Sequence, residues 1–105
     1  MKLLVTDNHD GEGVFPLFVK GSRVQDVEPT QRYSHWLACK INGIQTYVPD
    51  SYLQDDILIR DYNPTELIAT LGEELELLEI DFEWLYVKNK QNQSGWLPAE
   101  KAVSI

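Results

Sequence analysis

The segment that decides the fold class reads WLACKINGIQTYVP and covers residues 36–49. Two runs of aliphatic, aromatic and β-branched residues flank Asn42-Gly43, and each run has the length of a short strand. Asn-Gly is the strongest short signal for a two-residue hairpin turn, because both residues tolerate positive φ. The segment therefore predicts an antiparallel hairpin within an all-β fold.

A matching segment follows about 49 residues later in the chain. His35–Lys40 matches Glu83–Lys88, and Thr46–Pro49 matches Gly95–Pro98. Two further blocks match in the same order: Lys20–Val24 with Leu71–Leu75, and Val5–Asn8 with Ile59–Tyr62. Ordered matches of this kind indicate an internal duplication. We therefore expect one small domain in residues 1–55 (the first repeat) and another in residues 56–105 (the second repeat).

The rest of the chain favours strands over helices. Thr65–Ile80 is rich in helix formers, but Gly72 in its middle and the match between the repeats favour loop, turn and strand. Pro49 and Pro98 each begin a predicted single helical turn, because proline fixes φ. The short junction at residues 54–56 is not a flexible linker. The prediction is two small β-barrels in tandem, closely packed.

Composition excludes several classes of function. The chain has 105 residues and a formal net charge of −8. An acidic chain binds nucleic acid poorly, because phosphate affinity comes mainly from Lys and Arg. No apolar run approaches the ~18 residues needed to span a membrane. The first residues do not read as a signal peptide, so a cytoplasmic location is expected.

The sequence predicts neither a catalytic nor a metal centre. Cys39 lies three residues after Trp36, which places the two side chains on opposite faces of a strand and predicts a core position for the thiol. The cysteine and the two histidines, His9 and His35, lack the spacing of a zinc site. Residues 10–13 lack the further oxygen ligands of a calcium loop. We expect no enzyme activity and no cofactor.

Each half of the chain resembles a Src homology 3 (SH3) domain, and two such domains in tandem cover the whole sequence. The opening alanine-leucine-tyrosine-aspartate-tyrosine motif of the family is partly kept in Leu58–Tyr62, and Leu4–Asn8 keeps only the aspartate. The glycine of the family's diverging turn falls on Gly21 and Gly72. The family's tryptophan falls on Trp36 and Trp84, its aromatic-aliphatic-proline step on Tyr47–Pro49 and Trp96–Pro98, and its closing tyrosine on Tyr52, with Lys101 at that position in the second repeat.

This resemblance implies an aromatic ligand groove on each half. The implied groove residues are Trp36, Tyr47, Pro49 and Tyr52 in the first repeat, and Tyr62, Trp84, Trp96 and Pro98 in the second. Neither repeat has the family's full set. Asp10 and Glu12 are implied as contacts for a basic ligand residue, with a solvated loop as the alternative reading. Contact between the two domains is the alternative role for the aromatic faces.

The expected function is that of a non-catalytic protein-interaction module. It would bind an extended or Pro-rich segment of another protein, with basic residues facing the acids, and neither nucleic acid nor membrane. The loop from Tyr62 to Gly72 is shorter than its counterpart in the first repeat, and this resembles bacterial members of the family. The alternative is a bacterial peptidoglycan-binding module accessory to a lytic or surface enzyme, although the expected lack of a signal peptide weighs against it.

Overall fold

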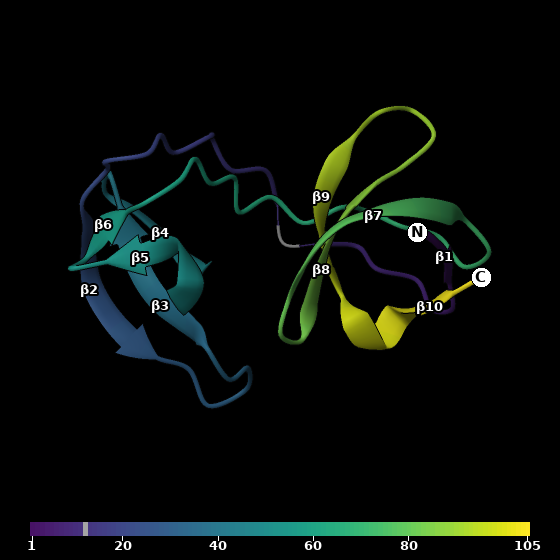
Figure 1. The fold of residues 1–105 in the computed structure, drawn as a ribbon, viewed down its shortest axis with the longest axis horizontal. Helices are drawn as coiled ribbons and strands as arrows, with labels where there is room; N and C mark the ends of the chain where they lie inside the picture. The colour runs from purple at the N-terminus through teal and green to yellow at the C-terminus, as the bar shows by residue number, and fades with distance from the viewer. Residues whose placement is uncertain (12) are drawn as a thin grey trace. The chain divides into compact units, whose positions relative to one another are not determined.

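The computed structural model describes residues 1–11 and 13–105, and these residues form two compact units. Unit 1 combines Met1–Val14 with Thr65–Ile105, and unit 2 is the continuous segment Phe15–Pro64 (Figure 1). The elements described are ten β-strands and two short 3₁₀ turns, so the all-β fold class is confirmed. None of these residues belongs to a helix that is long and apolar enough to cross a bilayer.

Unit 2 is built around the predicted hairpin. Its three-stranded antiparallel sheet has the order β2 (Val24–Pro29), β3 (Trp36–Ile41) and β4 (Ile44–Pro49). Asn42 and Gly43 have φ values of 52° and 80°, as a two-residue hairpin turn requires, so this prediction is confirmed. After β4, the 3₁₀ turn η1 (Asp50–Tyr52) leads to β5 (Leu53–Gln54), which pairs with β6 (Ile57–Leu58).

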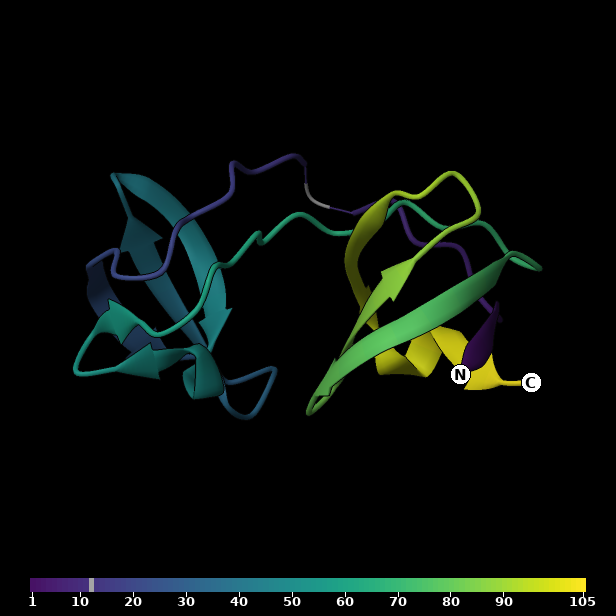
Figure 2. The same cartoon turned by 45° about the horizontal axis from the view of Figure 1, so that its top comes forward.

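Unit 1 contains a five-stranded antiparallel sheet. Its strand order is β10 (Ala102–Ser104), β1 (Lys2–Val5), β7 (Glu74–Asp81), β8 (Trp84–Lys88) and β9 (Ser94–Pro98). The 3₁₀ turn η2 (Ala99–Lys101) joins β9 to β10. Figure 2 shows β1, in purple, at the same end of this unit as the yellow C-terminal strand. The two edge strands of this sheet, β9 and β10, do not pair with each other in the described residues, so the sheet is open.

Strand alternation places one face of each hairpin in the interior. In β8, Leu85 and Val87 are buried, and they pack with Leu97 of β9 in the core of unit 1. In β3, Cys39 is only 3% exposed, and burial raises the pKa of its thiol to about 11. The burial of Cys39 confirms its predicted core position, and Trp36 lies on the other face of the same strand, as their odd spacing predicted.

The opening strands of the two repeats do not pair within their own repeat. Strand β1 pairs with β7 and β10, which both belong to the second repeat. Strand β6, which opens the second repeat, pairs with β5 of the first. The chain therefore passes between the units at residues 14–15 and again at 64–65, and this division differs from the expected boundary near residue 55. A pattern of alternating hydrophobic residues fixes which face of a strand is buried, but it does not choose between two similar partner strands.

Matching hydrogen bonds show that the exchange of opening strands is symmetrical. In unit 1, Val5 N–H donates to Glu73 O at 2.9 Å, and Thr6 N–H donates to Lys101 O at 2.8 Å. In unit 2, the corresponding bonds join Leu58 N to Ser22 O at 2.9 Å and Ile59 N to Tyr52 O at 2.9 Å. Val5 therefore occupies the position of Leu58.

The side chains that follow the opening strands fix the register of the two repeats. Asn8 Oδ1 accepts a hydrogen bond from Leu71 N at 2.7 Å, and Asp61 Oδ1 accepts one from Lys20 N at 2.8 Å. Asn8 thus corresponds to Asp61, and His9 corresponds to Tyr62. The sequence match aligned Asp7 with Asp61 because the two residues are identical. The backbone hydrogen bonds show that this alignment is wrong by one residue.

Candidate interaction site

The outer face of the β3–β4 hairpin carries three of the predicted site residues. Directly opposite residues of an antiparallel ladder share a face. Trp36 lies opposite Pro49, and Ala38 lies opposite Tyr47, so these four side chains lie on the face that does not contain Cys39. Tyr47 is 52% exposed, whereas Trp36 is 6% exposed and Pro49 is buried.

Tyr52 and Tyr62 form an aromatic pair in the same unit. Their rings meet edge to face, with centroids 5.1 Å apart. The Tyr62 hydroxyl donates a 2.6 Å hydrogen bond to Tyr47 O, which ties the pair to β4. The Arg60 guanidinium lies 4.3 Å from the centroid of the Tyr52 ring, close enough for a cation–π interaction. We refer to Trp36, Tyr47, Pro49, Tyr52 and Tyr62 as the aromatic cluster.

The grouping of Tyr62 differs from the one that the sequence suggested. Tyr62 was expected beside Trp84, Trp96 and Pro98 in the second repeat, but it lies in unit 2, beside Tyr52 of the first repeat. The cause is the strand exchange, which carries the opening segment of the second repeat into unit 2. Unit 2 thereby contains Tyr62 at the position for which the first repeat itself supplies His9.

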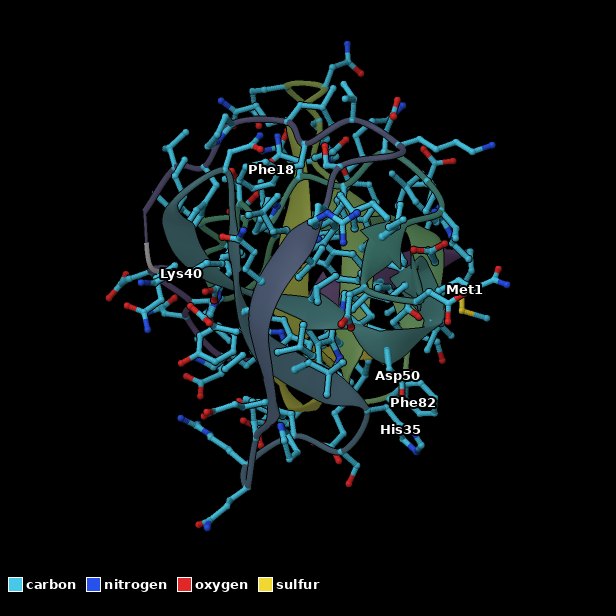
Figure 3. The ribbon with its side chains drawn as sticks, turned by 90° about the vertical axis from the view of Figure 1, so that its left-hand side faces the viewer. Met1, Phe18, His35, Lys40, Asp50 and Phe82 are labelled. Carbon is cyan, nitrogen blue, oxygen red and sulfur yellow. The ribbon has the colours of Figure 1, made fainter. Side chains whose placement is uncertain are left out.

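A polar pair lies at the end of the same hairpin. His35 Nδ1 lies 2.9 Å from Asp50 Oδ2, and both side chains are substantially exposed (Figure 3). The backbone reinforces this contact, because Asp50 N–H donates to His35 O at 2.7 Å. His35 has a φ of 67°, which is uncommon for a residue other than glycine. His35 directly precedes Trp36 in the sequence, and Asp50 directly follows Pro49. The pair therefore forms a fixed polar edge at the end of the hairpin where Trp36 lies opposite Pro49.

The remaining predicted aromatic residues lie on the corresponding face of unit 1. Trp84 is opposite Pro98, and Tyr86 is opposite Trp96. The rings of Tyr86 and Trp96 lie 4.9 Å apart at their centroids, and Trp96 is buried. Trp84 is half-buried and meets the His9 ring at 6.2 Å in an edge-on arrangement.

Ionisable residues take the place of the tyrosine pair in unit 1. His9 and Lys101 occupy the positions of Tyr62 and Tyr52, and Lys101 Nζ lies 3.4 Å from His9 Nδ1. The other ring nitrogen of His9 lies 2.8 Å from Glu66 Oε1, and both of these side chains are largely buried. We refer to His9, Glu66 and Lys101 as the ionisable cluster. The sequence did not predict it, because His9 and Glu66 are 57 residues apart.

The predicted acidic contact Asp10 belongs to a different unit from the aromatic cluster. Asp10 is exposed and belongs to unit 1, while Glu12 lies outside the described residues. Unit 2 contains five Lys or Arg and six Asp or Glu, for a formal charge of −1, whereas unit 1 has a formal charge of −7. The aromatic cluster thus lies in the nearly neutral unit.

Comparison with known proteins gives no match to a family model, to a curated protein or to a solved structure. Conclusions about function therefore rest on the chemistry of the two clusters.

Proposed function

We propose that the chain is a non-catalytic protein-interaction module with two SH3-like units. It binds an extended or Pro-rich segment of a partner protein at the aromatic cluster of unit 2. The observation that carries this proposal is the contact between Tyr52 and Tyr62 next to the hairpin that bears Trp36 and Pro49. The groove that the family resemblance implies uses two opening tyrosines, a tryptophan, a proline and a closing tyrosine, and unit 2 brings together all of these except the first opening tyrosine.

The chemistry of the aromatic cluster suits a ligand without regular secondary structure of its own. A polyproline-type segment has no internal hydrogen bonds and offers apolar rings and free carbonyls. Exposed Tyr47 supplies aromatic surface for direct contact, and the Tyr62 hydroxyl holds the Tyr47 backbone through a 2.6 Å hydrogen bond to Tyr47 O. A rigid aromatic base lowers the entropy lost on binding. For a single short segment we expect a Kd on the order of micromolar, or ~8 kcal/mol.

Electrostatics play a secondary part in this proposal. Unit 2 has a formal charge close to zero, and Arg60 places one cation at the Tyr52 ring. Exposed charges more than ~8 Å apart are screened at physiological salt. Binding to the aromatic cluster should therefore depend weakly on ionic strength. A steep salt dependence would indicate that a basic ligand meets the acidic residues of unit 1 instead.

The test is selection of ligands from a random 12-residue peptide library displayed on phage, with the intact chain immobilised. Enriched peptides are then titrated by calorimetry against the native chain, Tyr47→Ala and Phe82→Ala. Phe82 is an exposed aromatic residue of unit 1, 50% accessible, and so provides a control of similar size.

The expected result is enrichment of proline-containing peptides whose affinity falls at least tenfold in Tyr47→Ala and is unchanged in Phe82→Ala. Failure to enrich any peptide, or equal binding by the two variants, would contradict the proposed site. Sedimentation of the chain with purified peptidoglycan, together with failed peptide selection, would favour the cell-wall-binding function in its place.

A further inference from the structure

We infer that the aromatic cluster is a composite site made by both repeats, and that side-chain pairing specifies the strand exchange which assembles it. The site's role in ligand binding rests on the proposed function. Its assembly does not, and it follows from which side chains meet in each unit.

In unit 2, aromatic residues of the two repeats meet one another. Tyr62 belongs to the second repeat, and it exchanges two 2.8 Å backbone hydrogen bonds with Phe18 of the first. Its ring packs on Tyr52, also of the first repeat. Phe18 and Tyr62 are each only 2% exposed. The opening segment of the second repeat thus completes an apolar environment in unit 2.

In unit 1, the corresponding positions hold ionisable residues and a small one. His9 belongs to the first repeat, and it exchanges two 2.9 Å backbone hydrogen bonds with Ala69 of the second. Its ring nitrogens face Glu66 at 2.8 Å and Lys101 at 3.4 Å, both from the second repeat. The small Ala69 takes the place that Phe18 has in unit 2, so this environment is polar.

If each opening segment paired within its own repeat, a polar side chain would enter the aromatic environment and an aromatic side chain would enter the polar one. His9 would then meet Phe18 and Tyr52, without Glu66, and a buried polar group that loses its partner costs free energy. Tyr62 would meet Ala69 and Lys101, and it would leave the Tyr52 ring without its aromatic neighbour. The backbone hydrogen bonds are the same in kind in both arrangements, because the two units use equivalent bonds. The side chains therefore decide between the arrangements.

The consequence for function is that only the exchanged arrangement contains the aromatic cluster. In the unexchanged arrangement, Tyr52 would face His9 and the pair of tyrosines would not form in either unit. A ligand of the aromatic cluster must bind the exchanged arrangement selectively and stabilise it by mass action.

Two double-cysteine variants distinguish the arrangements in the intact chain. Leu4 lies directly opposite Val103 in the exchanged pairing of β1 with β10. The position equivalent to Val103 in the first repeat is Gln54, which lies opposite Ile57. Opposite residues of antiparallel strands have Cα atoms about 4.5–5.5 Å apart, within the range of disulfides. Leu4→Cys/Val103→Cys reports exchange, and Leu4→Cys/Gln54→Cys is its matched control.

Each variant is unfolded, refolded at low concentration and oxidised mildly, and the disulfides are identified by mass spectrometry. We expect an intramolecular disulfide in Leu4→Cys/Val103→Cys, in at least tenfold excess over that in Leu4→Cys/Gln54→Cys. An equal or greater yield from the control would overturn the exchange. Covalent dimers formed through Leu4→Cys/Val103→Cys would also overturn it, because β1 would then pair with a second copy.

The same assay tests the role of side-chain pairing. The double variant His9→Tyr/Tyr62→His exchanges the two deciding residues, so it should make the disulfide of Leu4→Cys/Gln54→Cys the main product. An unchanged disulfide pattern in a folded His9→Tyr/Tyr62→His variant would overturn the role of these residues.

A double-mutant cycle provides a second measurement if that variant does not fold. Coupling between Tyr52→Leu and Tyr62→Leu should change the unfolding equilibrium constant about three- to tenfold. Coupling between Tyr62→Leu and Lys101→Met should be absent, and the reverse result would contradict the inference. None of these measurements uses a ligand, so their failure is distinguishable from failure of the proposed function.

Discussion

Gly95→Ala should destabilise unit 1 strongly, because Gly95 lies against the backbone of the segment that returns from unit 2. A Cβ atom at position 95 would lie 2.6 Å from Leu67 N and 2.9 Å from Leu67 Cα. Ordinary van der Waals contact begins at 3.4 Å, so the backbone of Leu67 would have to retreat by roughly 0.8 Å. Two hydrogen bonds hold it in place: Leu67 N to Trp96 O at 2.9 Å and Trp96 N to Thr65 O at 3.1 Å.

The expected loss follows from these contacts. Weakening two hydrogen bonds costs ~0.5–1.5 kcal/mol each, and overpacking costs ~1–3 kcal/mol. Gly95 is not among the residues with positive φ, so its backbone conformation is open to alanine. Alanine also reduces the conformational entropy of the unfolded chain, and this offsets ~0.4–1 kcal/mol of the loss. The free energy of unfolding should therefore fall by about 1–5.5 kcal/mol.

Urea unfolding followed by tryptophan fluorescence measures this loss as a lower midpoint at constant m. Ser94→Ala, on the same strand and exposed, is the control and should change the free energy of unfolding by less than ~0.5 kcal/mol. A Gly95→Ala chain as stable as the Ser94→Ala control would show that Leu67 does not pack against β9.

Cys39 should label slowly with a thiol reagent in the folded chain, because a pKa raised from 9.0 to about 11 lowers the thiolate fraction at pH 8 about 100-fold, before burial is counted. The labelling rate should rise as the pH approaches 11 or when denaturant is added, and rapid labelling at pH 8 with the fold intact would contradict the core position. Tyr62→Phe removes a 2.6 Å hydrogen bond to Tyr47 O and should lower the free energy of unfolding by ~0.5–1.5 kcal/mol, so urea midpoints equal to the native ones would count against that bond. Fragments 1–54 and 57–105 each lose an exchanged strand, so each should be less stable than the intact chain. Fragment 15–64, by contrast, loses no strand of unit 2. Circular dichroism that shows 1–54 to be as stable as the intact chain would argue against the exchange.

Local signals in the sequence predicted local structure well. Asn42-Gly43 marks the β3–β4 turn, because this dipeptide accepts the two positive φ values that the turn needs. Pro49 and Pro98 each precede the single 3₁₀ turns that were predicted from their fixed φ. Gly72 marks a turn rather than a helix interior, and its φ of 91° shows why.

The pairing of distant segments was not predicted, because the two repeats offer similar partners. Val5 and Leu58 are both apolar residues that end up buried, so either could complete either unit. The information that separates them lies in His9 and Tyr62, which differ in polarity, and in the residues that they meet. The predicted site is also less accessible to a ligand than expected, since Trp36 was expected at the surface and is 6% exposed. Strand alternation gives the face of a side chain but not what covers it.

The most direct test of the exchanged arrangement is nuclear Overhauser contact between strands in the intact monomer in solution. The exchanged arrangement predicts cross-strand contacts between Leu3 and Ser104 and between Val5 and Ala102, which are opposite one another in β1 and β10. Isotope-filtered spectra of a mixed labelled and unlabelled sample should show that these contacts lie within one chain. Contacts from Leu3 to Asp55, the position equivalent to Ser104 in the first repeat, with none to Ser104, would contradict the exchange and with it the composite aromatic cluster.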